Sequence, residues 1–328
     1  MSSDFDYGIL NDTAHRPWPM PDSPWLMTQT WHDLMFAHWP IDVALLKGKV
    51  PAAFEIDTFD RQAWLGIVPF RMSNVAPRAV PALPWLSAFP ELNVRTYVRV
   101  GARAGVYFFS LDATNPVAVG VARLLVRLPY FTAAMECRDR DGWIHYRSAR
   151  ASRRAPPARF VGRYRPLGSA VPPARGTLEH FLTERYCLFT TDGSGRPYTL
   201  DIHHPRWPLQ NAEAEIEENT MAEASGFKLP AVAPLLHFSK RQDMVAWQLK
   251  KLRTENSELR TQNSELRTRE PGIRTPDPGL RNPIKFSSRF SRRPVSPQAA
   301  QSDRSVPATA VRQPIRTPGF RCEASRGL

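Results

Sequence analysis

The stretch FPELNVRTYVRVGARAGVYFFSLDATNPVAVGVARLLVRLPYFTA, residues 89–133, decides the fold. Apolar and polar residues alternate over residues 92–100, which is typical of a strand, and a glycine-bounded turn leads to a second strand, residues 106–111. Asn115 followed by proline is a favourable helix start, because asparagine caps the first turn and proline fits its first position. Pro129 ends that helix, so the stretch predicts two paired strands and a short helix.

Short strands dominate the rest of the sequence as far as residue 251. Residues 1–26 are aperiodic and are predicted to form an arm on the domain. An amphipathic helix is predicted for residues 27–39, which end before Pro40, and another for residues 178–185. Further strands are predicted for residues 54–59, 63–70, 133–138, 143–148, 160–165, 186–191, 198–203 and 244–249. Because hairpins join most of them, we predict an α+β fold of mostly antiparallel β-structure, a barrel with a few short helices.

The basic charge is concentrated at the end of the chain. Residues 252–328 hold 15 of the 44 basic and 7 of the 31 acidic residues, so they contribute +8 of the net charge of +13. The remaining residues are only mildly basic. The charge therefore does not indicate a nucleic-acid surface on the folded part, and no specific nucleic-acid partner is predicted.

Cysteine usage and hydropathy indicate a cytoplasmic location. The chain has three cysteines, Cys137, Cys187 and Cys322, and their spacing is not that of a metal site. An odd number argues against a disulfide framework and for a reducing compartment. The N-terminus shows no secretory pattern, and the longest apolar run, residues 117–125, is too short to span a bilayer. We therefore predict no membrane partner.

Several segments of residues 27–251 resemble one bacterial family. They are WHDLMFAHWPID (31–42), AWLGIVPFRM (63–72), FPELNVRTYV (89–98), GVYFFSLDA (105–113), LEHFLTERY (178–186) and IHHPRWPLQ (202–210). They are similar to the YqjF-like family of unknown function, of the DUF2071 type. Residues 89–134 also resemble the acetoacetate decarboxylase superfamily, which implies a cone-like antiparallel barrel around a small polar pocket.

That second resemblance excludes the best-known chemistry of the superfamily. Its helix ends in a proline followed by two lysines, one of which forms a Schiff base with a ketone substrate. Here Tyr130 and Phe131 stand at the lysine positions. The resemblance also places Glu91 at the pocket glutamate and Arg123 at an arginine of the short helix.

The candidate catalytic residues are Glu91, as general acid or base, and Tyr130, as a donor to a substrate carbonyl. The alternatives are an exposed acid at a strand end and a packed tyrosine with a satisfied hydroxyl. The candidate substrate-binding residues are Arg71, Asn93, Arg95, Arg123 and Glu184. Asn93 and Arg95 share the polar face of their strand, which is either the inside of the barrel or a solvent-facing surface. Arg71 follows an apolar strand, so a structural ion pair with Glu91 or Glu184 is an alternative to a substrate contact.

Other catalytic classes lack their motifs. A metal site is suggested by Glu179, His180, Glu184, His203 and His204. However, no HExxH occurs, and adjacent histidines on a strand point to opposite faces. No GxSxG elbow and no phosphate-binding glycine loop is present. We predict no metal and no cofactor.

Two functions remain open from the sequence. The first is a small-molecule pocket protein that acts as an enzyme on a small organic acid without a Schiff base. The second is a non-catalytic ligand-binding or interaction protein that keeps the fold. An oligomer is compatible with either function. Fold resemblance alone does not choose between them.

The tail, residues 252–328, has a different character. A heptad, TENSELR, is repeated with one change over residues 261–267, but one leucine per heptad is too few for a coiled coil. From Pro271 onward proline, arginine, serine and glycine dominate, which predicts disorder. The string PGIRTPDPGLRNP resembles peptides that arise when a transfer-RNA gene region is translated, so a translation artefact is an alternative interpretation.

The tail is therefore predicted to be dispensable for folding. Ordering it would cost roughly 1–2 kcal/mol per residue of backbone entropy, which its few apolar residues do not offset. A chain truncated after Lys251 should keep the melting temperature of the full chain, measured by differential scanning calorimetry. A fall of several degrees would show that the tail contributes to the fold.

Overall fold

The computed structural model describes residues 5–80, 87–114, 127–152 and 155–252. The helix start at Asn115, Arg123 and the tail from residue 253 lie outside the described residues. The strands are β1 (Met27–Ile41), β2 (Glu55–Ile56), β3 (Ala63–Pro77), β4 (Phe89–Val100), β5 (Arg103–Ala113), β6 (Tyr130–Arg140), β7 (Trp143–Arg150), β8 (Arg159–Val171), β9 (Cys187–Thr191), β10 (Pro197–His203), β11 (Leu209–Asn219), β12 (Leu235–Ala246) and β13 (Lys250–Lys251). The helices are η1 (Tyr7–Asn11), α1 (Val43–Lys47), α3 (Leu178–Thr183) and α4 (Met221–Ala224).

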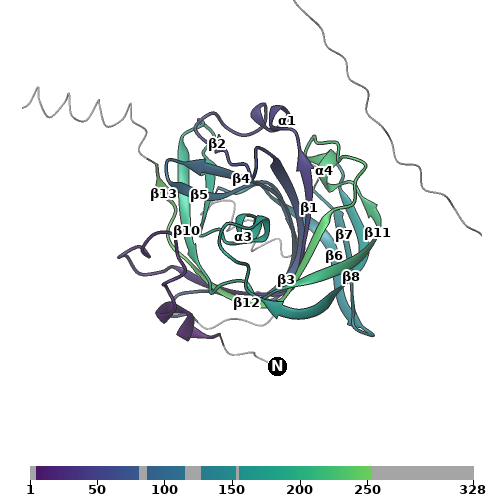
Figure 1. Ribbon diagram of the computed structural model, residues 1–328, viewed down its shortest axis with the longest axis horizontal. Coiled ribbons are helices and arrows are strands. Elements are labelled where there is room, and N and C mark those ends of the chain that lie inside the picture. The colour runs from purple at the N-terminus through teal and green to yellow at the C-terminus, as the bar shows by residue number, and fades with distance from the viewer. Residues whose placement is uncertain (1–4, 81–86, 115–126, 153–154, 253–328) are drawn as a thin grey trace, which may run out of the picture. The chain divides into compact units, whose positions relative to one another are not determined.

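The strands belong to one sheet whose pairings are mostly antiparallel. Seven strands are connected by the pairings β4–β5, β5–β9, β9–β10, β10–β12, β12–β1, β1–β3 and β3–β4. Parallel pairing joins β5 to β6 and to β9. Strands β6, β7, β8 and β11 continue the sheet from β5 to β12. Figure 1 shows α3 surrounded by strands, which agrees with the predicted α+β class.

Strands β1, β3 and β4 are buried on both sides. Their outer face, which carries Met35, Ile67 and Val94, packs in one apolar cluster with residues of β7 and β8 such as Tyr146 and Phe160. Their inner face carries Phe36, Phe70 and Tyr97, and Tyr97 packs in a cluster with Leu182 of α3. Burial on both faces explains why β1 and β3 lack a simple alternation of apolar and polar residues, whereas β4 keeps one over residues 92–100.

The predicted helix over residues 27–39 is wrong, because this segment is strand β1. Asp33 has a φ of 49°, and the register with β3 shifts by one residue between His32 and Ala37. Such a bulge changes which residues face inward, so Trp31 and Leu34 both join the inner cluster although they are three residues apart. The bulge thus produced a spacing that imitates a helix.

Two tyrosines fix the outer layer to these strands. The Tyr146 hydroxyl lies 2.7 Å from the carbonyl oxygen of Glu91 and 3.0 Å from that of Phe70. The Tyr164 hydroxyl donates to the carbonyl oxygen of Asp33 at 2.7 Å. Burial holds the pKa of both hydroxyls well above the ordinary value, so they remain donors at neutral pH.

The two ends of the described chain pack against β10 and β12. Ile9 of η1 joins a cluster with Val245 and Trp247, so the N-terminal arm lies on the domain. Leu252, which the sequence assigned to the tail, donates its backbone N–H to Pro197 and packs against the outer cluster. No helix in the described ranges is long and apolar enough to cross a membrane.

A buried ion pair joins β5 to β7. Arg150 makes two hydrogen bonds to the carboxylate of Asp112, at 2.7 and 2.9 Å, and the two side chains are 1% and 0% exposed. The Arg150 guanidinium also lies 4.3 Å from the ring centre of Phe131. Removing one member of such a pair leaves an uncompensated buried charge.

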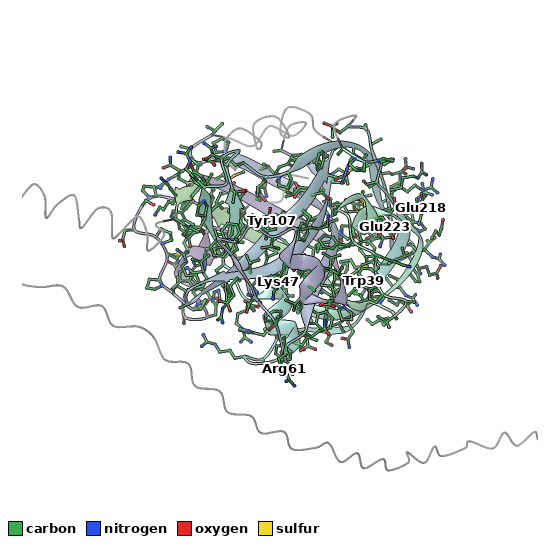
Figure 2. All side chains as sticks on the ribbon, turned by 90° about the horizontal axis from the view of Figure 1, so that it is seen from above. Trp39, Lys47, Arg61, Tyr107, Glu218 and Glu223 are labelled. Carbon is green, nitrogen blue, oxygen red and sulfur yellow. The ribbon has the colours of Figure 1, made fainter. Side chains whose placement is uncertain are left out.

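We predict that Arg150→Met lowers the free energy of unfolding by about 3–5 kcal/mol, measured by urea denaturation, because Asp112 is left unpaired. Arg159→Met is the matched control, since Arg159 pairs with Glu218 and the two side chains are 58% and 38% exposed. Figure 2 shows Glu218 at the periphery of the molecule. It should cost no more than about 1 kcal/mol. Equal effects of the two substitutions would contradict the structural role of the buried pair.

Candidate functional site

Strand β4 presents polar side chains to the inner face. Pairing sets Phe70 of β3 and Ala113 of β5 directly opposite Glu91, and both neighbours belong to the inner cluster. Alternate residues of a strand share a face. The polar residues that alternate on this face are Glu91, Asn93, Arg95, Tyr97 and, at the end of the strand, Arg99.

Tyr130 reaches the same face from β6. The parallel pairing of β5 with β6 sets Tyr130 beside Leu111, which in turn lies opposite Asn93. Tyr130 and Asn93 both form side-chain hydrogen bonds with the carboxyl group of Glu91. The structure therefore brings together the two predicted catalytic residues and one predicted substrate-binding residue.

The carboxyl group of Glu91 is held in its protonated form. Glu91 is only 3% exposed. Burial raises its pKa from 4.5 to about 8, and nearby Asp112 adds to the rise, while the hydrogen bonds from Tyr130 and Asn93 oppose it. Burial and the neighbouring Glu91 likewise raise the pKa of Tyr130 well above its usual value. At neutral pH the site thus offers two proton donors.

Two buried oxygen atoms of this site have unused hydrogen-bonding capacity. Within the described part of the chain, neither Oε2 of Glu91 nor Oδ1 of Asn93 has a hydrogen-bond partner. Most buried polar atoms in folded proteins are satisfied, so two unsatisfied atoms side by side on one strand require an explanation. A bound molecule would supply their partners.

Aromatic rings line the inner face beside Glu91. Trp31 and Trp207 stack with ring centres 5.7 Å apart, and Phe36 meets Trp207 edge-on at 4.9 Å. Phe70, directly opposite Glu91, lies 6.1 Å from Trp31. The indole nitrogen of Trp207 has no partner among the described residues. The wall is therefore apolar, with one free donor.

Arg95 lies on the inner face near α3. Its Nη2 donates to the carbonyl oxygen of Leu182 at 3.2 Å and to the hydroxyl of Tyr97 at 3.4 Å. Tyr97 itself donates to Leu182 at 2.8 Å, so the His38 Nε2, 2.6 Å from the Tyr97 hydroxyl, is the donor in that contact. Burial and the charge of Arg95 lower the pKa of His38 well below its usual value, so His38 is neutral.

The structure separates Arg71 from this group. Arg71 follows Phe70 on β3 and therefore points to the outer face, where its Nε lies 2.7 Å from a carboxylate oxygen of Asp33. It pairs with neither Glu91 nor Glu184, the two partners that the sequence suggested. Arg71 therefore forms a structural ion pair, as the sequence allowed, but its partner is Asp33 and not Glu91 or Glu184.

Glu184 has structural partners as well. Its carboxylate accepts a hydrogen bond from the backbone N–H of Trp207 at 2.9 Å and another from the hydroxyl of Tyr186. Glu184 thereby positions the segment that carries Trp207. Glu184 follows α3 and does not lie on β4 with Glu91. Its link to the candidate site is its hydrogen bond to the backbone of Trp207.

The sequence did not identify the aromatic wall or His38 as parts of the site. Trp31, Phe36 and His38 lie in the segment predicted to be helical, and only the bulge at Asp33 sets Trp31 on the same face as the other two. Trp207 follows β10 in a segment without periodicity. In the described ranges no group of three or more histidine, cysteine or acidic side chains is placed to hold a metal ion.

The comparisons with known proteins agree with this architecture. The family model described as "Uncharacterized conserved protein (COG2071)", DUF2071, matches residues 28–243. The chain belongs to the DUF2071 family. It is 46% identical over 232 residues to the uncharacterized protein YqjF of Bacillus subtilis, an alignment that covers 71% of this chain and 95% of that protein.

A solved structure supports the fold. The crystal structure of acetoacetate decarboxylase from Legionella pneumophila superposes with a TM-score of 0.50 at 14% identity, covering 78% of this chain and all of that one. At this identity the likeness concerns the fold alone. It confirms the predicted acetoacetate-decarboxylase-like fold of this DUF2071 protein, while the family membership confirms the predicted YqjF-like resemblance.

The raised pKa of Glu91 makes stability depend on pH. A group whose folded-state pKa is raised contributes stability that is complete below its unfolded value, 4.5, and is lost as the pH rises through about 8. The loss is at most about 1.4 kcal/mol per pH unit. We predict that Glu91→Gln, which cannot ionise, removes this loss, so that its stability relative to the natural chain increases between pH 5 and pH 9.

Urea denaturation at pH 5, 7 and 9 measures the effect. Glu55→Gln is the control, because Glu55 is exposed on β2 and should leave the pH dependence unchanged. If the Glu91→Gln and natural proteins lost stability in parallel over this range, the carboxyl group would not be protonated in the folded state.

Proposed function

We propose that this protein is an enzyme that performs general acid–base chemistry on a small organic acid, with Glu91 as the proton-transferring residue. The proposal includes a barrel of the acetoacetate decarboxylase type, formed by the seven strands around α3, whose interior holds the substrate. The observation that carries it is the carboxyl group of Glu91, which is buried, raised in pKa to about 8 and unpartnered at Oε2 within the described residues. Such groups are typical of catalytic acids and bases.

Tyr130 and Asn93 support this role. Tyr130 is protonated and hydrogen-bonded to Glu91. When the protonated Glu91 is the donor in that contact, the single O–H of Tyr130 is free to donate to a substrate carbonyl oxygen and to stabilise negative charge that develops there. Asn93 orients the carboxyl group of Glu91 and has a free carbonyl oxygen toward a substrate donor. Glu91 then gives or takes the proton that the reaction moves.

The chemistry proceeds without a Schiff base. A phenol and a benzyl group, Tyr130 and Phe131, occupy the two positions at which the resemblance expects lysines. Neither side chain forms an imine with a carbonyl compound. Phe131 instead lies under the guanidinium of Arg150, so it supports the buried ion pair with Asp112.

A non-catalytic ligand-binding protein is the second candidate. The observation that favours it is the direct packing of Trp31, Trp207 and Phe36, which fills part of the inner face with aromatic rings. In this case Glu91 and Asn93 would hold a ligand without moving a proton. The two functions differ in whether proton transfer depends on Glu91.

Proton exchange distinguishes them. We predict that the full-length protein catalyses the exchange of hydrogen for solvent deuterium on the carbon next to the carbonyl group of at least one small oxo acid. NMR measures the rate of this exchange. Glu91→Gln should reduce the exchange rate by at least about a hundredfold, as expected for loss of a general acid–base residue, and Tyr130→Phe by about tenfold. Glu55→Gln should exchange at the rate of the natural protein.

Two outcomes would contradict the proposal. Binding of an oxo acid without exchange would favour the ligand-binding function, and exchange that survives Glu91→Gln would remove Glu91 from the mechanism. Borohydride reduction with acetone or acetoacetate serves as the control for imine chemistry. A stoichiometric adduct within residues 80–135, detected by mass spectrometry, would contradict the absence of a Schiff base.

A further inference from the structure

Arg95 is surrounded by neutral groups. Its hydrogen-bond acceptors are the carbonyl oxygen of Leu182 and the hydroxyl of Tyr97, and its guanidinium lies 5.2 Å from the ring centre of Phe36. Its Nε is buried and has no partner among the described residues. The guanidinium is thus held in position while one of its donors stays unused.

No carboxylate of the described residues forms an ion pair with Arg95. Two arginines with buried side chains have an acidic partner, Arg150 with Asp112 and Arg185 with Asp57. Glu91, on the same face, is mostly protonated at neutral pH and does not supply the missing charge. Arg95 is only partly buried, but its Nε lies out of contact with solvent and has no partner among the described residues. A donor of this kind, on a guanidinium without an acidic neighbour, favours an anion from outside the chain.

The neighbouring residues do not change this balance. His38 contacts Tyr97 and is neutral. His237 of β12 is also buried, and burial lowers its pKa; Glu179 of α3 acts in the opposite direction on His237. Among the described residues, the guanidinium of Arg95 is therefore the positive charge without an acidic partner at this end of the inner face.

We infer that Arg95 forms a carboxylate-binding subsite, and that the ligand of this protein is an organic monocarboxylate long enough to reach from Arg95 toward Glu91. This inference rests on the proposed function and names its substrate class. Arg95 and Glu91 are four residues apart on one strand, so their Cα atoms are separated by about 13 Å. Asn93, between them, offers a further polar contact on the same face.

The surroundings define the rest of the ligand. The middle of the ligand lies beside Phe36, Trp207 and Phe70, which favours an apolar or aromatic group. A single positive charge with one free Nε suits a monoanion, whereas a phosphate dianion would bring excess negative charge into a buried site. The subsite therefore selects a carboxylate attached to an apolar chain or ring.

Isothermal titration calorimetry on the full-length protein tests this assignment. The probes are acetate, hexanoate, 3-phenylpropionate, 3-phenylpropionamide and phenyl phosphate. We expect 3-phenylpropionate and hexanoate to bind more tightly than acetate, and 3-phenylpropionate to bind at least about tenfold more tightly than its amide, because only the acid forms charge-assisted hydrogen bonds. Tighter binding of phenyl phosphate, or equal binding of acid and amide, would overturn the assignment.

Variants connect the binding to Arg95. Arg95→Gln should weaken 3-phenylpropionate at least about tenfold, and Arg95→Lys should weaken it less, since lysine keeps the charge and loses the planar donor edge. Arg99→Gln is the matched control on the same strand, because Arg99 faces Asp57 at 3.8 Å and should not affect binding. Thermal unfolding of each unliganded variant confirms that it is folded, and the lysine variant keeps the test valid if glutamine prevents folding.

Glu91→Gln separates this inference from the proposed function. It should abolish proton exchange and leave the binding of 3-phenylpropionate within about threefold, because it retains the carboxylate subsite at Arg95. If Arg95→Gln abolished the binding of 3-phenylpropionate while neither the natural protein nor any variant catalysed deuterium exchange, the subsite would be supported and the acid–base proposal would be wrong. If 3-phenylpropionate bound with unchanged affinity to Arg95→Gln and to Arg95→Lys, the subsite would be wrong, whatever the result of the exchange experiment.

Discussion

Burial of β4 on both faces is the constraint from which the rest of the site follows. Its outer face, with Leu92 and Val94, packs in the main apolar cluster, and its inner face carries Glu91 and Asn93. A carboxyl group at that position has no access to bulk water and remains protonated at neutral pH. The Tyr146 hydroxyl, bonded to the carbonyl oxygen of Glu91, ties the backbone at this position to the outer layer. The chemistry of the inner face thus depends on packing that lies behind it.

The sequence predicted the central part of this arrangement. The alternation of residues 92–100 placed Asn93 and Arg95 on one face, and the resemblance of residues 89–134 singled out Glu91 and Tyr130. Local periodicity was enough to predict which residues of β4 share a face, because apolar and polar residues alternate along most of this strand. The parallel pairing that brings Tyr130 beside Leu111 is a long-range contact, and only the resemblance indicated it.

The remaining features depend on contacts that local pattern does not encode. Strand β1 is buried on both sides and bulges at Asp33, so its apolar spacing predicted a helix. The face taken by Arg71 follows from its register with β1 and β4, and a one-residue shift would have turned it inward. Register is decided by packing across strands, so a single segment does not reveal it.

A tyrosine at the position where the resemblance expects a lysine changes what the inner face is able to do. A lysine amine reacts as a nucleophile once its pKa is lowered, whereas the buried hydroxyl of Tyr130 has a raised pKa and serves as a donor. Together with the protonated Glu91 it makes this end of the inner face neutral and donor-rich. The positive charge stays at the other end, on Arg95, whose polar contacts with Leu182 and Tyr97 are neutral. On the proposed carboxylate subsite, an anionic ligand would be drawn to Arg95 at one end and would meet the proton donors at the other, so the two ends would give it a single orientation.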